Sequence, residues 1–439
     1  MDKFYHSVHL EPDLCKGCIN CLKRCPTEAI RVRNGKASII KEYCIDCGEC
    51  VRICPHHAKK AATDKIEDLN KHKYKIALPP PSLYAQFNNL DDKSLVLDAL
   101  LSMGFDDVFE VAAAAEIVSE ITRKLLAGKD NSLPLPRALP IISSACPAIT
   151  RLIRVRFPNL IDLISPLTSP MEIAAEMAIE RALKQTSFSR DEIGVFFITP
   201  CPAKYAAINS PLRKEKSKVS GALSMSELYP MLLHHMKQIS SNKIVLPITN
   251  QTAMTDIPTT SGRIGISWGG RGGEAGGLIT DNILAADGIE NVIRVLEDLE
   301  DDKLKNLHFI ELNSCNGGCV GGVLTVENPY IANVKLNALR KYLPVSGMRL
   351  NEGKIPECAF SKGRIVYLPV YNLGDTVSQS IKVMKEADSV MKELPGLDCG
   401  CCGAPTCQTH AEDVARGTAS KNDCIHIMRE YMSQLRVDN

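Results

Sequence analysis

Two cysteine-rich stretches decide the fold of the first part of the chain: CKGCINCLKRCP at residues 15–26 and CIDCGECVRICP at residues 44–55. Each has the spacing C-x2-C-x2-C-x3-C-P, in which three cysteines of one tight loop bind one cubane and the fourth binds the other. The alternative is a pair of zinc sites, but zinc prefers two separated C-x2-C pairs. The spacing therefore predicts two [4Fe–4S] clusters, one held by Cys15, Cys18, Cys21 and Cys54 and the other by Cys25, Cys44, Cys47 and Cys50.

Both runs resemble those of bacterial ferredoxins, which implies a ferredoxin-like domain over residues 1–62 that relays electrons. The 18 cysteines of the 439-residue chain fall mostly in clusters, a pattern that in a reducing compartment points to metal rather than to disulfides. The formal net charge of +1 gives no reason to expect a nucleic-acid partner. No apolar run reaches the ~20 residues that cross a bilayer, and no apolar segment typical of a secretory signal opens the sequence. We expect a cytoplasmic protein without membrane insertion.

Residues 75–357 alternate short apolar runs with amphipathic stretches, which predicts an α/β domain after a charged linker at 62–75. The expected strands are 75–78, 139–142, 193–198 and 307–312, and the expected helices are 108–126 and 289–302. Three of these strands run into loops with cysteine: SSACPA, TPCPAK and ELNSCNGGCVGG. Sites in open α/β sheets form beyond the carboxyl ends of strands, so we expect a metal site built from Cys146, Cys201, Cys315 and Cys319. The alternative is that these are buried structural thiols.

The three loops, in this order and at these separations, resemble the three signatures of the [FeFe]-hydrogenases. The resemblance covers about residues 10–357 and implies a two-lobed catalytic domain with a six-iron site. In that site Cys146, Cys201, Cys315 and Cys319 hold a [4Fe–4S] cubane, and Cys319 also bridges to a di-iron subsite carrying CO, cyanide and a dithiolate amine. The resemblance assigns one cyanide to Lys204 and the other to the turn of Pro81 and Ser82. A cation in a dry pocket would stabilise such an anion, whereas the alternative for Lys204 is a solvated loop lysine.

The sequence departs from the family at the position of its proton-relay cysteine, where this chain has Ala145. Alanine cannot carry a proton, so the usual path is broken at this catalytic position. Thr199 and Asn313 replace two pocket methionines, and Met171 replaces a glutamine. Glu116 and Glu120 lie roughly where the family's path acids lie, and Glu120 is our candidate for a water-fed route; the alternative is exposed helix charge.

The last part of the chain, residues 374–439, contains the spacing C-x2-C-x4-C-x16-C at Cys399, Cys402, Cys407 and Cys424. It resembles the four-cysteine module of corrinoid iron–sulfur proteins and of ferredoxin-oxidising membrane complexes, which implies a small helical domain with a further [4Fe–4S] cluster; zinc is the alternative. Cys358 and Cys401 stay unassigned. A glycine-rich stretch at 266–278 offers a weak nucleotide fingerprint, and backbone turning explains it better.

We therefore expect an anaerobic hydrogenase-type protein that interconverts H2 with protons and electrons, slowly, in a hydrogen-sensing role. Missing relay cysteines are described in family members assigned as sensors. The alternatives are a competent ferredoxin-linked hydrogenase with a non-standard proton path, and a non-enzymatic iron–sulfur carrier without the di-iron subsite. The expected partners are H2 and protons, ferredoxin or another redox protein, hydrogenase maturation proteins, and a signalling protein as the output.

Overall fold

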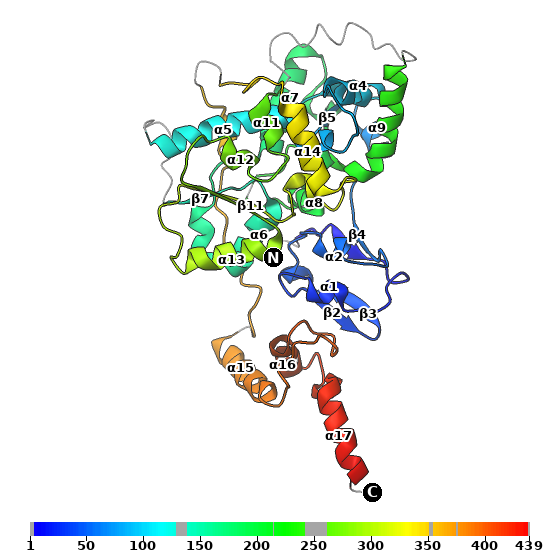
Figure 1. Cartoon of the computed structure of the whole chain (residues 1–439), viewed down its shortest axis with the longest axis vertical. Helices are drawn as coiled ribbons and strands as arrows, with labels where there is room; N and C mark the ends of the chain where they lie inside the picture. The colour runs from blue at the N-terminus through cyan, green and yellow to red at the C-terminus, as the bar shows by residue number, and fades with distance from the viewer. Residues whose placement is uncertain are drawn as a thin grey trace. The chain divides into compact units, whose positions relative to one another are not determined.

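The computed structural model describes residues 4–128, 138–213, 215–241, 261–350, 354–374 and 376–437 (Figure 1). The chain divides into two compact units, residues 1–61 with 367–439 and residues 62–366. The first and last parts of the chain, which hold the two ferredoxin-type runs and the C-terminal cysteines, thus belong to one unit. None of the helices in the described ranges is both long and apolar enough to cross a bilayer.

The N-terminal half of the first unit consists of two short antiparallel strand pairs with a one-turn helix in each cysteine loop. Asn34 and Gly35 both have positive φ, which is the two-residue turn that suits a tight hairpin. The elements are β1 (Val8–Leu10) paired with β4 (Lys59–Ala61), β2 (Ile30–Arg33) paired with β3 (Lys36–Ile39), α1 (Asn20–Lys23) and α2 (Glu49–Arg52).

The C-terminal half of the first unit is helical. Thr376 and Thr406 cap two helices, because each side chain accepts a hydrogen bond from the backbone N–H three residues later. A small core forms around Ala387, Leu394 and Ala411, and Cys407 and Cys424 belong to it. The helices are α15 (Val377–Met391), α16 (Cys407–Ala415) and α17 (Ile425–Val437).

The second unit is α/β, and its described residues form two parallel sheets. The four-stranded sheet has the order β6 (Asp107–Val108), β5 (Tyr74–Leu78), β8 (Ile193–Thr199) and β9 (Gly221–Ser224). The three-stranded sheet has the order β10 (Ile283–Asp287), β11 (Phe309–Asn313) and β7 (Ile141–Ile142). The α/β fold with the four expected strands is therefore confirmed, and all seven residues of β8 are buried, as strands covered on both faces are.

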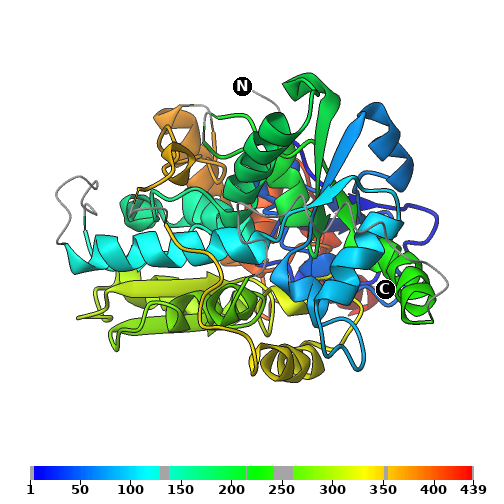
Figure 2. The same ribbon diagram turned by 90° about the horizontal axis from the view of Figure 1, so that it is seen from above.

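Helices surround both sheets. Figure 2 shows α5 (Val111–Ala127), in cyan, running along the yellow-green strands, and its Leu126 packs against Ile141 and Phe309. Other residues of α5 join α7 (Pro170–Gln185) in the core of the four-stranded sheet, so one helix serves both sheets. The remaining α-helices of the residues that the structure describes in this unit are α3 (Pro81–Tyr84), α4 (Ser94–Ser102), α6 (Pro147–Arg156), α8 (Pro202–Asn209), α9 (Met225–Ser240), α11 (Arg263–Ser267), α12 (Gly273–Gly276), α13 (Ile289–Glu300) and α14 (Pro329–Arg340).

The expected linker at 62–75 packs onto the second unit instead of bridging freely. The backbone N–H of Asp64 donates to the carbonyl oxygen of Ala222 at 2.9 Å, and its carboxylate accepts a hydrogen bond from Tyr205. Its charge suggested a linker, and these pairings attach the segment to the sheet edge beside β9.

Candidate functional site

Three strands deliver the four central cysteines, as expected. Cys201 follows β8 of one sheet, whereas Cys146 follows β7 and Cys315 and Cys319 follow β11 of the other sheet. Burial raises the pKa of Cys319 to about 12; nearby Lys204 opposes this, and Cys201 and Cys146 add to it. The same neighbours act on Cys201, whose pKa is also raised by burial. Buried thiols this close together could all be negatively charged only if a cation lay among them. An iron cluster would supply that positive charge.

Two of these cysteines share a local geometry that the sequence explains. Cys146 and Cys201 are extended residues directly before Pro147 and Pro202, and these prolines open α6 and α8. Proline suits the first helical position because its φ is already helical and it needs no hydrogen bond there. Each of these two cysteines therefore lies at the N-terminus of a helix.

The loop that carries Cys319 is joined to the Cys201 loop through its glycines. A Cβ at Gly322 would lie 2.2 Å from the carbonyl oxygen of Pro200, and one at Gly318 would lie 2.6 Å from the carbonyl carbon of Gly270. These glycines admit neighbouring backbone segments, and the contact between Gly322 and Pro200 brings the Cys319 and Cys201 loops together.

A cavity of about 60 Å³ opens beside Cys319. Its wall contains most of the residues singled out from the sequence: Pro81, Ser82, Ala145, Met171, Lys204, Asn313 and Cys319. Lys204 Nζ lies 3.1 Å from the carbonyl oxygen of Ala145. The turn with Ser82 is held in place by Tyr84, which donates to buried Glu110, and by Gln86, which donates to the Ser82 carbonyl. The cavity thus presents one thiol, one ammonium group and one hydroxyl group from separate segments.

The hydroxyl group of Ser82 tests whether these residues fit a bound group. It is fully buried and makes no hydrogen bond with the described part of the chain. An unsatisfied buried hydroxyl costs about 1–3 kcal/mol, so it indicates a ligand in this wall. With Lys204 facing the same space, the residues fit an anionic or strongly polar ligand such as cyanide, and Cys319 could bind the iron that carries it.

Sequence reasoning missed a second feature of this cavity, the acid pair Glu274 and Glu311. Glu311 accepts hydrogen bonds from the N–H groups of Gly272 and Ala275, whereas Glu274 accepts one from the Ser143 hydroxyl. Burial raises the pKa of Glu274 to about 8, and repulsion from Glu311 adds to the rise. One carboxyl group of the pair is therefore protonated near neutral pH and can hold a proton beside the cavity.

The two acids proposed from the sequence lie elsewhere. Glu116 is buried, and its carboxylate already has five hydrogen-bond donors. These are the N–H groups of Gly262, Gly265, Gly347 and Met348 and the Ser346 hydroxyl. It is a structural anchor, not exposed helix charge. Glu120 accepts a hydrogen bond from the N–H of Leu350 and does not line the cavity.

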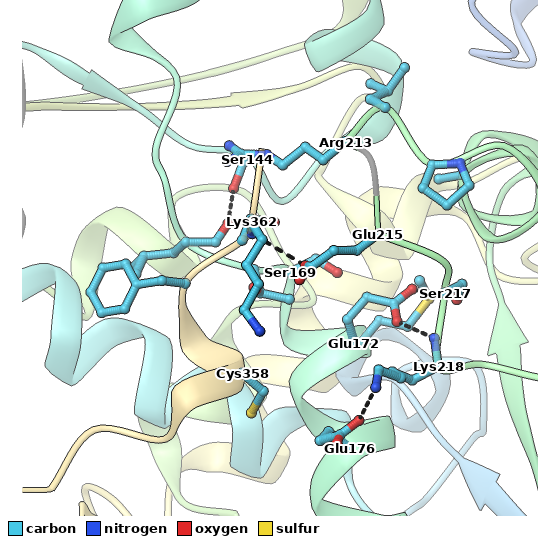
Figure 3. Close-up of a pocket in the computed structure, with 18 of the residues that line it drawn as sticks. Ser144, Ser169, Glu172, Glu176, Arg213, Glu215, Ser217, Lys218, Cys358 and Lys362 are labelled. Atoms are coloured by element: carbon cyan, nitrogen blue, oxygen red, sulfur yellow. Dashed lines mark hydrogen bonds and ion pairs between the residues drawn. The ribbon is translucent and has the colours of Figure 1, made fainter. Parts of the chain in front are cut away.

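A larger cavity, of about 730 Å³, shares Met171 and Lys204 with the small one (Figure 3). Glu172, Glu176 and Glu180 line it from one face of α7 at helical spacing. Glu172 accepts from the Ser217 hydroxyl at 2.6 Å, and Lys218 pairs with Glu176 at 3.1 Å, so both contacts fix the loop over the cavity. Half-buried Cys358 also lines it, and burial raises the pKa of its thiol to about 11.

The eight N-terminal cysteines gather in the two predicted sets. Cys25, Cys44, Cys47 and Cys50 line one cavity. In the other set, burial raises the pKa of Cys21, and Cys18, Cys54 and Cys15 raise it further, so the four thiols are neighbours.

The C-terminal cysteines Cys399, Cys402, Cys407 and Cys424 also line one cavity, while Cys401 is exposed. His410 lines the same cavity and is 1 % exposed. Neither of its ring nitrogens makes a hydrogen bond within the described ranges. Its pKa is lowered by burial and by Arg33, although Asp423 and Asp413 act in the opposite sense. A buried neutral imidazole with a spare N–H fits a cluster whose sulfurs accept hydrogen bonds, and sequence spacing alone gave no reason to single it out.

Three family models match separate segments of the chain. The family model "Iron only hydrogenase large subunit, C-terminal domain" matches residues 73–281 and 272–323, more than half of the chain. A 4Fe-4S dicluster model matches residues 7–55, and an Fe-S cluster model matches residues 394–426.

Individual relatives are distant. The chain is 26 % identical to a subunit of an NADP-reducing hydrogenase from Solidesulfovibrio fructosivorans, over 45 % of this chain and 31 % of that protein. It is 24 % identical to the periplasmic [Fe] hydrogenase large subunit of Nitratidesulfovibrio vulgaris, over 72 % of this chain and 86 % of that protein. It is also 24 % identical to iron hydrogenase 1 of Clostridium pasteurianum, over 70 % of this chain and 62 % of that protein. A solved [FeFe]-hydrogenase variant from Chlamydomonas reinhardtii aligns at a TM-score of 0.47 and 16 % identity, over 70 % of this chain and 98 % of that one.

Proposed function

The chain belongs to the iron-only, or [FeFe]-, hydrogenase family, and from this premise we propose that it interconverts H2 with protons and electrons at the cavity beside Cys319. The observation that carries the proposal is the convergence of Cys319, Lys204 and the Ser82 hydroxyl on one cavity, next to Cys146 and Cys201; this hydroxyl has no hydrogen-bond partner among the described residues.

Cys146, Cys201, Cys315 and Cys319 would hold the cubane, and Cys319 would join it to a di-iron subsite with CO, cyanide and a dithiolate amine. When bound, this group supplies the iron at which H2 is split heterolytically. Lys204 and Ser82 would hold the diatomic ligands, Pro81 would shape the turn, and the apolar wall would exclude water. Sixteen of the 18 cysteines would thus be ligands in a chain of four cubanes: eight in the ferredoxin part, four at the cavity and four near the C-terminus.

We assign the protein a low turnover and a sensory role, because Ala145 lies in the cavity wall where the family has its relay cysteine. A sensor needs binding of H2 and a change of redox state rather than flux. Ferredoxin or another redox protein would exchange electrons with it, maturation proteins would supply the di-iron group, a signalling protein would receive the output, and the cytoplasm would be its compartment.

A second function, a competent hydrogenase with a non-standard proton path, is favoured by one observation. Glu274, with a pKa of about 8, lies in the cavity wall and bonds to Ser143. Its carboxyl group could move a proton through Ser143 where Ala145 cannot. Glu120, outside the wall, could serve only through intervening water.

Assays of H2 oxidation and H2 evolution on the matured protein test the proposal. Lys204→Met should abolish both reactions, because the anion would lose its cation. Lys216→Met, which removes an exposed lysine of the larger cavity, should leave both unchanged. If the wild type contained its cubanes but bound no CO and showed no H2 turnover, the protein would be an iron–sulfur carrier.

A further inference from the structure

Within the first unit, the ferredoxin part donates hydrogen bonds to backbone carbonyl oxygens of the C-terminal cysteine module. The N–H of Val32, in β2, donates to the carbonyl oxygen of Gly403 at 2.9 Å, and the guanidinium of Arg33 donates to the carbonyl oxygen of Cys402. Gly403 has a φ of +81°, and a Cβ there would lie 1.8 Å from the carbonyl oxygen of Val32. Only glycine permits this approach, so the cysteine loop fits against the strand.

A lysine joins the two cysteine loops directly. Lys23, between Cys21 and Cys25, donates from Nζ to the carbonyl oxygens of Asp398 at 2.6 Å and Pro405 at 2.9 Å. A Cβ at Gly400 would lie 3.2 Å from Leu22 Cδ2 and from Lys23 Cδ. The loop that follows Cys18 therefore packs against the loop that carries Cys399 and Cys402.

A buried ion pair fixes the orientation of this contact. Arg31 donates from Nε and Nη2 to the two carboxylate oxygens of Asp413, in α16, at 2.6 and 3.2 Å, and Arg33 donates to the same carboxylate at 3.0 Å. The side chains of Arg31 and Asp413 are each 7 % exposed. A bidentate pair has one geometry, and leaving either charge unpaired is costly. The C-terminal module is therefore a fixed part of the ferredoxin surface and not a tethered domain.

We propose that the C-terminal module is a permanent third electron-transfer site beside the two ferredoxin clusters. Its cluster exchanges single electrons, across the Lys23 contact, with the cluster held by Cys15, Cys18, Cys21 and Cys54. One electron leaves the reduced ferredoxin cluster and reduces the oxidised C-terminal cluster, and no bond is made or broken. The proposal rests on the proposed function only for the cellular source of the electrons, since a chemical reductant can replace H2.

Electron paramagnetic resonance of the full chain tests the contact. The protein, with its iron–sulfur clusters reconstituted, is fully reduced with titanium(III) citrate in the absence of H2 and compared with Cys424→Ala, which lacks one C-terminal ligand. We expect magnetic interaction between the C-terminal and ferredoxin spins in the wild type, seen as broadening and fast spin relaxation that Cys424→Ala loses. The proposal would be overturned if the wild-type spectrum were the simple sum of two parts: the ferredoxin signals seen in Cys424→Ala and the signal of a C-terminal cluster that does not interact with them. Neither result depends on H2 chemistry, so failure here and failure of the hydrogenase proposal are separate outcomes.

Hydrogen exchange gives a readout that does not require the cysteine variant to fold. Lys23→Gln should speed exchange of the Val32 amide by about tenfold, because charge-assisted bonds to two carbonyls are lost. Lys16→Gln removes an exposed charge from the same cysteine loop and should leave this rate unchanged. Equal rates in Lys23→Gln and Lys16→Gln would show that the Lys23 contact does not hold the module, against the proposal.

Discussion

Lys204 Nζ donates a hydrogen bond to the carbonyl oxygen of Ala145 at 3.1 Å, so the cation of the cavity is joined to the residue that we expect at the position of the family's relay cysteine. The contact uses the backbone oxygen of Ala145, and the residue also lines the cavity. A longer side chain at this position can therefore be introduced without removing the partner of Lys204.

Ala145→Cys should raise H2 turnover by at least about tenfold, because general acid–base catalysis typically contributes 10²- to 10⁴-fold. The measurement is H2 evolution from a reduced dye with equally matured samples. Ala145→Ser, which adds a hydroxyl without a usable pKa, is the control and should stay near the wild type. An unchanged rate in Ala145→Cys would show that proton delivery does not limit turnover.

The stability of the second unit should depend on pH through Glu274. Its pKa is raised to about 8 in the folded chain from an ordinary value of 4.5, so the folded state binds the proton more tightly. The stabilisation is complete below about pH 4.5 and is lost as the pH rises through 8; its upper bound is about 5 kcal/mol. Thermal unfolding at pH 6 and pH 9 should show a smaller loss of Tm for Glu274→Gln than for the wild type. Exposed Glu180→Gln should behave as the wild type, and an identical loss in all three proteins would refute this assignment.

Asp413→Asn should destabilise the first unit by about 3 kcal/mol, because Arg31 would keep its charge in a buried place without a full partner. Asp388→Asn changes an exposed aspartate on α15 and serves as the control. Anaerobic urea unfolding followed by circular dichroism gives the midpoints. Coincident midpoints for the two variants would mean that the ion pair does not hold α16.

His410→Ala should lower the midpoint potential of the C-terminal cluster by on the order of 60 mV, the equivalent of a tenfold change for one electron. A hydrogen bond to a cluster sulfur stabilises the more negative, reduced state, and the ring nitrogens of His410 have no hydrogen-bond partner in the described part of the chain. A redox titration should show this shift with the ferredoxin potentials unchanged. A C-terminal potential that does not move would mean that His410 makes no bond to the cluster.

The sequence was sufficient to predict those parts of the fold and site that depend on neighbouring residues. Cysteine spacing predicted which thiols of 15–54 would gather, and the strands before Cys146, Cys201 and Cys315 follow from apolar runs whose ends meet at sheet edges. Lys204 and Ser82 came from the family resemblance, and the structure places both in the cavity wall.

Contacts between distant segments could not be predicted in this way. Glu274 and Ser143 are 131 residues apart, and Arg31 and Asp413 are 382 apart, so no window of sequence contains either pair. One signal was present: Glu311 is a charged residue inside an apolar strand, which is costly unless the acid is bound there. Glu116 misled us because an acid on a helix face gives no indication of the five donors that occupy it.

Infrared spectroscopy after maturation with a synthetic di-iron cofactor tests the central claim most directly. The wild type should show bands of iron-bound CO and cyanide, and Lys204→Met should lose or shift the cyanide bands while the absorption of the cubanes persists. A wild-type protein with all of its cubanes but with no bands of iron-bound CO or cyanide would contradict the assignment of this cavity.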